Sequence, residues 1–140
     1  EKEKGIIDLP LAPLKNYKNL MAVNYKVGKK ALTTYRILQK YNGYSLAEVK
    51  LLTGRMHQIM AHFRAIGNPL ALDVLYNDKH KTKITAGEIL GTDDNREVIA
   101  RLTLHAAQLE FKGIQGNSFK FGAPLPSDMV LLIRTLQKTA

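Results

Sequence analysis

The sequence predicts an α+β fold in which helices pack on a mainly antiparallel, mixed sheet. Strand-like patterns dominate residues 21–52, a helical pattern follows directly, and strands followed by a helix recur in the second half. The chain has 140 residues, of which 45% are hydrophobic, which is enough for one domain with a core and hardly enough for two. We therefore expect residues 1–140 to form a single domain.

The first part of the chain carries most of the strand signals. Residues 1–20 contain two prolines and few periodic apolar residues, so we expect an extended arm there. Residues 21–41 hold a turn at Gly28 and Lys29 between two β-prone runs. Residues 44–52 alternate in polarity, and two or three antiparallel strands are thus expected before the helical pattern. The apolar face of this last run holds Ala47, Val49 and Leu51, and the polar face holds Glu48 and Lys50.

A helical pattern begins at Met56, from which apolar residues recur with the spacing i, i+3, i+4 and i+7. Gly67 and Pro69 supply the signal that ends this helix. The predicted buried stripe consists of Met56, Ile59, Met60 and Phe63.

The second half repeats the order of strands and helix. Residues 77–97 are polar and are expected to form an excursion from the body. Residues 101–111 and 117–125 are predicted to be two further strands. A last helix is expected with Ser127 as its N-cap and Asp128 in its first turn. Its buried stripe is predicted to consist of Met129, Leu132, Ile133 and Leu136.

Composition excludes several classes of site. The chain contains no cysteine, so disulfides, thiolate metal sites and cysteine nucleophiles are excluded. No stretch approaches the about 18–20 apolar residues of a membrane span, and a cytoplasmic protein without membrane contact is expected. Lysine and arginine number 21 against 12 acids, giving a net charge of +9. Such a basic domain is a candidate for binding nucleic acid, the alternative being a basic surface without a partner.

The histidines do not predict a metal site. His57 and His62 are five residues apart, so they would point about 140° apart around a helix. His80 and His105 are isolated in the sequence. We therefore expect no bound metal.

Arg55 raises a physical question. The helical pattern starts directly after Thr53 and Gly54, so Arg55 and His57 would occupy a first turn that contains no acid. The free N–H groups and the dipole of a helix N-terminus disfavour a cation and favour an anion. Arg55 would therefore be stabilised by an RNA phosphate or by a carboxylate elsewhere in the fold. Alternatively it points to solvent, at a cost below about 1 kcal/mol.

Residues 51–76, LLTGRMHQIMAHFRAIGNPLALDVLY, resemble the signature of the RluA-type RNA pseudouridine synthases. That pattern runs L-x-T-G-R-x-H-Q-I-R-x-H, then I-G-x-P-L, then an aspartate and a tyrosine. Residues 28–35 are similar to the G-K-x-A-x-T-x-Y run of the family, and LHAAQLEF and APLPSDM resemble its closing strand and last helix start. The likeness keeps the order of these motifs and covers nearly the whole chain.

Two features depart from the family pattern. Met60 stands where the family usually has arginine. The motif that carries the nucleophilic aspartate, H-R-L-D-x-x-T-S-G, and the following Y-x-A-x-V-x-G strand do not occur. The resemblance therefore implies the C-terminal portion of a longer catalytic domain, with the nucleophile upstream, and a chain that is inactive as given.

The resemblance also implies a reaction that needs no cofactor or metal. A uridine of structured RNA, ribosomal or transfer, is flipped into the cleft and isomerised to pseudouridine. In the family the arginine of T-G-R pairs with the aspartate, so Arg55 is the expected catalytic residue. Ile59 is expected near the cleft, with plain core packing as the alternative. The full-length enzyme is expected to be a monomer.

Basic residues outside this motif are candidate contacts for RNA phosphates as a group, although each one singly fits a solvated surface role. Asp73 and Tyr76 are expected to shape the turn after the helix. The candidate RNA contacts are Lys29, Lys30, Arg36, Arg64, Lys79, Lys81 and Lys83.

Two other classes of protein stay open on the sequence. One is a basic RNA-binding module that has lost catalysis. The other is a structural or partner-binding domain whose charge is incidental. An upstream H-R-L-D motif separates the enzyme from both, and salt-dependent RNA binding separates the module from the structural domain.

Overall fold

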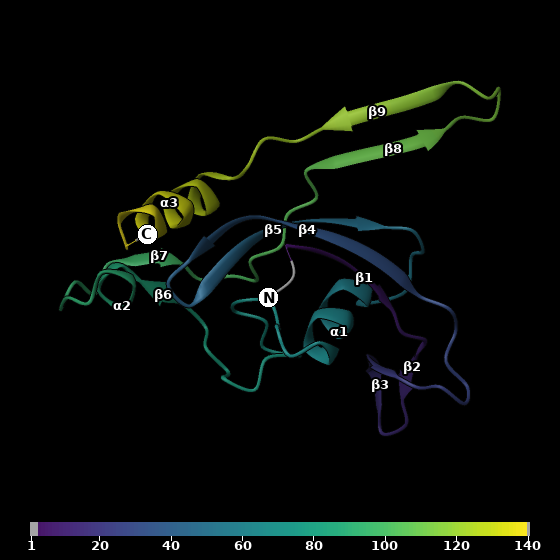
Figure 1. Cartoon of the computed structure of the whole chain (residues 1–140), viewed down its shortest axis with the longest axis horizontal. Coiled ribbons are helices and arrows are strands. Elements are labelled where there is room, and N and C mark those ends of the chain that lie inside the picture. Colours follow the sequence, from purple (N-terminus) through teal and green to yellow (C-terminus); the bar gives the residue numbers. More distant parts are fainter. Residues whose placement is uncertain (1–2, 140) are drawn as a thin grey trace.

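The computed structural model describes residues 3–139 and confirms the α+β fold. Its strands form one three-stranded sheet and three hairpins or strand pairs, and every pairing among these strands is antiparallel. Figure 1 shows the three-stranded sheet at the centre, with one helix beneath it and two helices to one side. The strands are β1 (Lys4–Asp8), β2 (Leu11–Leu14), β3 (Tyr17–Val23), β4 (Leu32–Tyr41), β5 (Tyr44–Leu51), β6 (Ile84–Thr85), β7 (Glu97–Ile99), β8 (Gln108–Lys112) and β9 (Ser118–Gly122). The helices are α1 (Gln58–Ala65), α2 (Ala86–Leu90), α3 (Ser127–Leu136) and a 3₁₀ turn, η1 (Gln137–Thr139).

The expected extended arm at residues 1–20 is wrong for the part that the structure describes. β1 pairs with β4, and β2 forms a hairpin with β3, so five strands precede α1 instead of two or three. The sequence did not predict this hairpin because the segment contains two prolines, which are rare within strands. Pro13 lies in β2, which pairs with β3 on one side and on the other makes a single bridge, from Leu11 to Lys29. At Pro13 the strand is therefore an edge, which tolerates a residue without an N–H group.

The predicted turn at Gly28 is confirmed. The Gly28 N–H donates to the Asn24 carbonyl over 2.9 Å, and the Asn24 side chain accepts from the N–H groups of Lys26 and Val27. The flanking strands do not pair with each other, because β3 pairs with β2 while β4 pairs with β1 and β5. The turn therefore passes the chain from the hairpin to the central strand of the main sheet.

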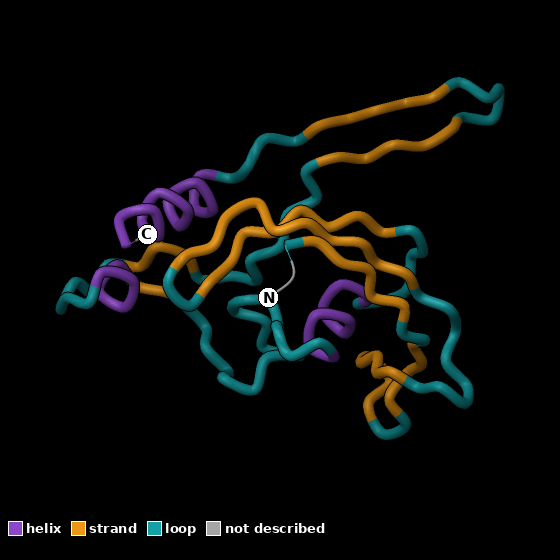
Figure 2. Tube along the Cα trace, in the orientation of Figure 1, coloured by secondary structure: helices purple, strands orange, loops and turns teal. Residues whose placement is uncertain are grey.

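The helix α1 packs against one face of the main sheet, with the Phe63 ring 5.5 Å from that of Tyr35 in β4 (Figures 1 and 2). The predicted stripe is partly wrong. Met56 lies outside the helix and is 47% exposed, while Ile59 and Met60 are half-buried. The predicted stop is confirmed, because Gly67 adopts a left-handed φ of 79°. The residues of α1 that are buried are Gln58, Ala61, His62 and Phe63.

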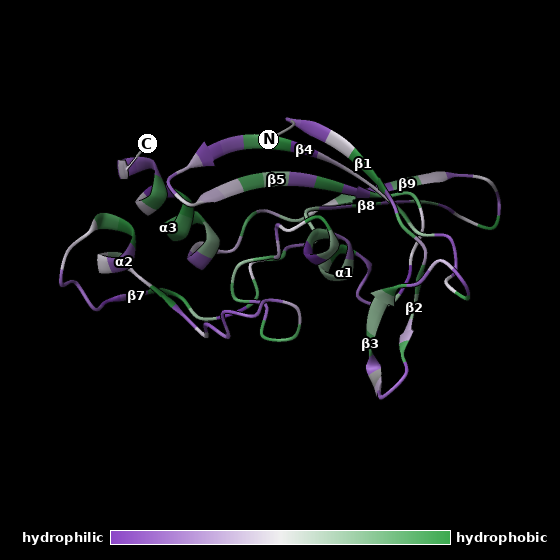
Figure 3. Ribbon diagram, turned by 60° about the horizontal axis from the view of Figure 1, so that its bottom comes forward, coloured by the Kyte–Doolittle hydropathy of each residue, from purple (hydrophilic) through white to green (hydrophobic). Residues whose placement is uncertain are grey.

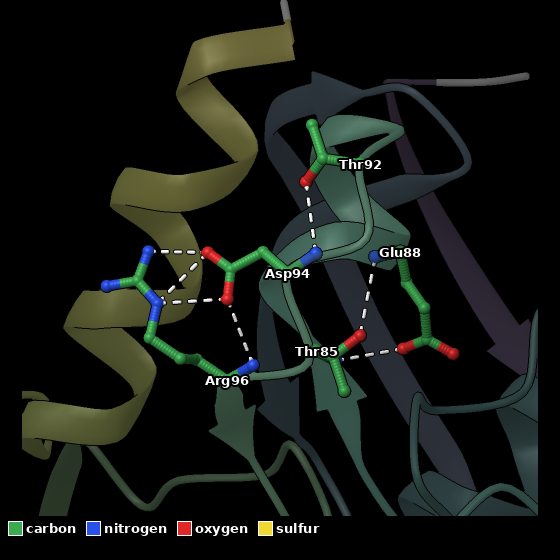
Figure 4. Close-up of polar contacts among 5 residues, drawn as sticks. All are labelled: Thr85, Glu88, Thr92, Asp94 and Arg96. Atoms are coloured by element: carbon green, nitrogen blue, oxygen red, sulfur yellow. Dashed lines mark hydrogen bonds and ion pairs between the residues drawn. The ribbon is translucent and has the colours of Figure 1, made fainter.

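The prediction that residues 77–97 form an excursion from the body is wrong. They contribute β6 and α2 to a core that also receives α3, and Ile84 is fully buried. The polar character of the segment comes from residues that cap and brace it. Thr85 and Glu88 form a reciprocal capping box at the start of α2 (Figure 4). The core comprises Leu72, Ile84, Ala86, Ile89, Val98, Ile99, Met129, Leu132 and Leu136.

An ion pair closes the loop between α2 and β7. Figure 4 shows the Arg96 guanidinium facing the Asp94 carboxylate, which also accepts from the Arg96 N–H. Hydrogen bonds from Arg96 lower the pKa of Asp94 to about 2. Because this pKa is depressed, the contribution of the pair to stability is present above the ordinary pKa of aspartate and is lost as the pH falls toward 2.

The last helix begins at Ser127 as its first helical residue, with Pro126 as the N-cap, so the predicted N-cap is wrong by one residue. Asp128 lies in the first turn as predicted, and it binds the Arg101 guanidinium with two bonds of 2.6 and 2.8 Å. Met129, Leu132 and Leu136 are buried as predicted, whereas Ile133 is half-buried.

The two predicted strands after residue 101 are confirmed as β8 and β9, although residues 101–107, 117 and 123–125 lie outside them. These strands form a hairpin that extends away from the rest of the molecule (Figures 1 and 3). Every residue of both strands is exposed. In residues 3–139, no helix has the length and apolar character needed to span a bilayer.

Because Ile84 is fully buried, residues 77–97 should contribute to the stability of the fold. We expect Ile84→Ala to lower the free energy of unfolding by about 2–5 kcal/mol, because it leaves a cavity in the core. Ile114→Ala is the matched control, since Ile114 is fully exposed, and it should change stability by less than about 0.5 kcal/mol. Urea denaturation of both variants checks this, and a control that costs as much as Ile84→Ala would contradict it.

Candidate active site

The side chain of Gln58 shapes the turn between β5 and α1. Its Oε1 accepts from the Thr53 hydroxyl over 2.9 Å and from the Arg55 N–H over 3.0 Å. The Thr53 hydroxyl oxygen in turn accepts from the Leu32 N–H over 2.8 Å. The turn that carries Arg55 is therefore hydrogen-bonded to the beginning of β4.

The amide nitrogen of Gln58 continues this network into the interior. It donates to the Leu32 carbonyl over 3.1 Å and to the Thr33 hydroxyl over 3.0 Å. The Thr33 hydroxyl lies 2.8 Å from Nδ1 of His62, and Nε2 of His62 lies 2.9 Å from the Leu9 carbonyl. Because a carbonyl can only accept, Nε2 of His62 carries a proton, and in the neutral ring Nδ1 accepts from Thr33.

This polar network is buried. Thr33 and His62 are fully buried and Gln58 is 2% exposed. Burial of polar groups is costly unless each has a partner, and here the amide, the hydroxyl and both ring nitrogens have one. The network joins α1 to β4 and to the segment that follows β1.

Arg55 does not lie in the first turn of the helix as the sequence predicted. The helix starts at Gln58 with His57 as its N-cap, so Arg55 precedes the cap, although the first turn lacks an acid as expected. The side chain is exposed, and its Nε donates to the Lys30 carbonyl over 3.1 Å. Within residues 3–139 no carboxylate pairs with its guanidinium. The arginines that do pair with carboxylates are Arg36, Arg64, Arg96 and Arg101.

His57 and Tyr76 fix the other side of the turn. His57 adopts a left-handed φ of 51°, which is unusual for a residue other than glycine. Its Nδ1 lies 3.1 Å from the Tyr76 hydroxyl, which accepts from the Met21 N–H over 2.8 Å. Burial raises the pKa of Tyr76 above its ordinary value. His57 and His62 therefore bind different partners.

The structural role predicted for Asp73 is confirmed. Its Oδ1 accepts from the N–H groups of Leu75 and Tyr76, each over 3.0 Å, and so shapes the turn that places the Tyr76 ring. The Tyr76 side chain packs in a small core with Leu11, Ala31 and Ala61. An apolar groove lies beside it, between the β2–β3 hairpin and α1.

The predicted RNA contacts lie on several elements. Lys29 and Lys30 are exposed next to Arg55, and Lys79 and Lys83 are exposed in the segment before β6. Ile59, the predicted cleft residue, is half-buried on α1 beside Gln58. The other three predicted RNA contacts form ion pairs, which are Arg36–Glu48, Arg64–Asp78 and Lys81–Glu88.

Sequence reasoning missed the roles of Thr33, Gln58 and His62. All three match positions of the family pattern, and this was the available signal. Their burial depends on partners from β4 and from the segment after β1, which periodicity along one helix does not show. In the described part of the chain, no three potential metal ligands come together.

Comparisons with known proteins agree with the family resemblance of the sequence. The profile of the RNA pseudouridylate synthase family matches residues 1–65. Ribosomal large subunit pseudouridine synthase D of Haemophilus influenzae is 36% identical over 137 residues, covering 95% of this chain and 40% of that protein. YlyB of Bacillus subtilis, an uncharacterised RNA pseudouridine synthase, is also 36% identical over 137 residues, covering 97% of this chain and 40% of that protein.

Solved structures share the fold. Human RNA pseudouridylate synthase domain containing 4 superimposes with a TM-score of 0.68 at 23% identity, covering 96% of this chain and 57% of that one. The fold of the chain is thus that of RNA pseudouridylate synthase domains. In sequence the chain is similar to RluA-type pseudouridine synthases over nearly its whole length. It spans about two fifths of the length of the curated relatives described above.

The buried network predicts a specific cost for removing one hydroxyl. Thr33→Val keeps the shape but leaves Nδ1 of His62 without a donor and removes one acceptor of Gln58, so it should destabilise the chain by about 1–3 kcal/mol. Thr34→Val is the matched control, because the half-buried Thr34 hydroxyl makes only a 3.4 Å bond to the Lys50 carbonyl. The control should cost less than about 0.5 kcal/mol by urea denaturation. Equal effects would show that the network does not support the fold.

Proposed function

We propose that this chain is the C-terminal part of the catalytic domain of an enzyme that isomerises uridine to pseudouridine in RNA. In this proposal Arg55 pairs with a nucleophilic carboxylate supplied by the rest of the enzyme. The observation that carries it concerns Arg55, whose backbone N–H and Nε are held by Gln58 and the Lys30 carbonyl. Its guanidinium has no carboxylate partner in residues 3–139. The length of the relatives, of which this chain spans 40%, leaves room for such a partner.

The pairing has a chemical purpose. In the isomerisation the bond between C1′ and N1 breaks, a bond between C1′ and C5 forms, C5 loses a proton and N1 gains one. A carboxylate that starts this reaction must be ionised and held in place. An adjacent guanidinium favours the ionised form through its charge and its hydrogen bonds, and it fixes the direction of the carboxylate. A guanidinium held in advance needs little reorganisation when the reaction occurs.

RNA is the proposed substrate. The net charge of +9 favours a polyanion, and the exposed Lys29 and Lys30 lie next to Arg55 in the fold. The relative from Haemophilus influenzae is named for the ribosomal large subunit, so ribosomal RNA is the first RNA to test. A uridine must leave its stack to reach a reactive group, and in this proposal the phosphates of its neighbours bind these lysines.

The isolated chain should bind RNA without reacting, because none of its own aspartates lies in a nucleophile motif. Incubation with transcribed ribosomal and transfer RNA should give no pseudouridine by mass spectrometry. Affinity for single-stranded RNA should fall with salt, with a log–log slope of about −0.7 for each phosphate neutralised. Turnover by the chain alone would contradict the assignment of the nucleophile to another part. An absence of binding at low salt would favour a structural domain.

Arg55 should matter for reaction far more than for binding. The test uses a fusion in which the part of the Bacillus subtilis relative that this chain does not match is joined to the chain. Arg55→Ala should slow single-turnover formation of pseudouridine by at least about 100-fold, because an electrostatic partner of the reacting group is lost. RNA affinity should change by about fivefold or less, as expected for one exposed ion pair.

Arg134→Ala is the control for this experiment. Arg134 is exposed on α3 and makes no ion pair within residues 3–139, so its loss removes the same charge without touching the turn. It should react at the normal rate. If Arg55→Ala reacts normally but binds RNA poorly, Arg55 is a phosphate contact, and the basic RNA-binding module becomes the better account of the chain.

A further inference from the structure

The β8–β9 hairpin carries an apolar face that none of the described elements covers. Leu109 lies opposite Phe121 in the pairing register, and Phe111 lies opposite Phe119, so all four side chains lie on one face. They are 41–60% exposed. The three phenylalanine rings stack on one another with centroids 5.3, 6.0 and 6.4 Å apart.

The other face of this hairpin is polar. Glu110 and Lys120 form an ion pair of 2.8 Å there, and Lys112 and Ser118 occupy the next register position. An amphipathic two-stranded hairpin is marginally stable alone, and an apolar face of this kind normally packs on another layer. Figure 1 shows the hairpin extending from the body, with none of the described helices packed on it.

We propose that the face formed by Leu109, Phe111, Phe119 and Phe121 is the surface on which the rest of the enzyme docks. This inference rests on the proposed function, in which the chain is part of a longer catalytic domain. The occupant is an apolar element from the part of the polypeptide that the relatives have and this chain lacks. That part is large, because the chain spans only 40% of the relatives' length.

A second copy of this chain fits the face less well. A specific protein interface buries about 800 Å² on each partner. An aromatic side chain buries about 150–250 Å² when covered completely, so four half-exposed side chains offer about 400 Å². A segment of the same polypeptide does not need so large an area, because the connection gives it a high effective concentration.

RNA also fits the face less well than a protein segment. Surfaces that stack on single-stranded bases combine aromatic rings with a cationic groove. Here the four side chains carry no charge, the rings already stack on one another, and Lys120 is paired with Glu110. The occupant should present aliphatic or aromatic side chains, because a charged group would lose its water without gaining a partner.

Hydrogen exchange tests the proposal on the isolated chain and on the fusion with the Bacillus subtilis part. In the isolated chain the amides of residues 108–122 should exchange rapidly, while those of β4 are protected and show that the chain is folded. In the fusion the same hairpin amides should exchange at least about 100-fold more slowly, since packing raises the free energy of local opening. The double variant Phe111→Ser and Phe119→Ser should lose this protection. Lys112→Ser, on the polar face, should keep it.

Each outcome of the hydrogen-exchange experiment either supports or contradicts the proposed docking surface. An unprotected hairpin in a fusion whose β4 amides are protected would overturn the proposal. Protection in the isolated chain that grows with protein concentration would assign the face to a second copy, and protection that appears only with added RNA would assign it to RNA. A fusion based on the Haemophilus influenzae relative repeats the test, and an unprotected hairpin there also counts against it. A protected hairpin in an inactive fusion would contradict the proposed function and leave the docking surface standing.

Discussion

The structure depends on the side-chain amide of Gln58. One end of this amide holds the turn that carries Arg55, and the other end reaches into the core to Thr33 and, through it, to His62. A glutamine can serve both ends because it has two donors and an acceptor with two lone pairs. With this single side chain, the position of Arg55 is linked to β4 and to the buried face of α1. A shift of either element would disturb the turn.

If Arg55 pairs with a carboxylate as proposed, the hydrogen bonds of its turn hold the cation in place before that partner binds. The backbone N–H of Arg55 is occupied by Gln58, and its Nε is occupied by the Lys30 carbonyl, so two points of the residue are fixed. The remaining guanidinium nitrogens are the groups with which a carboxylate would form a bidentate pair. A catalytic site built in this way gains its precision from supporting residues that never touch the substrate.

Sequence reasoning reached the fold class, the β8–β9 strands and the end of α1 at Gly67, because these have local signals in periodicity and in glycine. It placed the start of α1 at Met56, two residues early, because the left-handed His57 is invisible to an apolar pattern. It treated residues 77–97 as peripheral, because polar residues outnumber apolar ones there, although the few apolar side chains enter the core. Tertiary partners decide such positions, and a single sequence does not show them.

The most direct measurement is a crystal structure of the fusion between this chain and the part of the Bacillus subtilis relative that it lacks. If Arg55 is the partner of the nucleophile, its guanidinium should lie about 2.7–2.9 Å from a carboxylate oxygen of that part. The bonds of Gln58 to Thr53, Arg55 and Thr33 should be unchanged, because the turn is already in place. A guanidinium that faces solvent or an RNA phosphate, with every carboxylate of the added part held elsewhere, would contradict this account of the site.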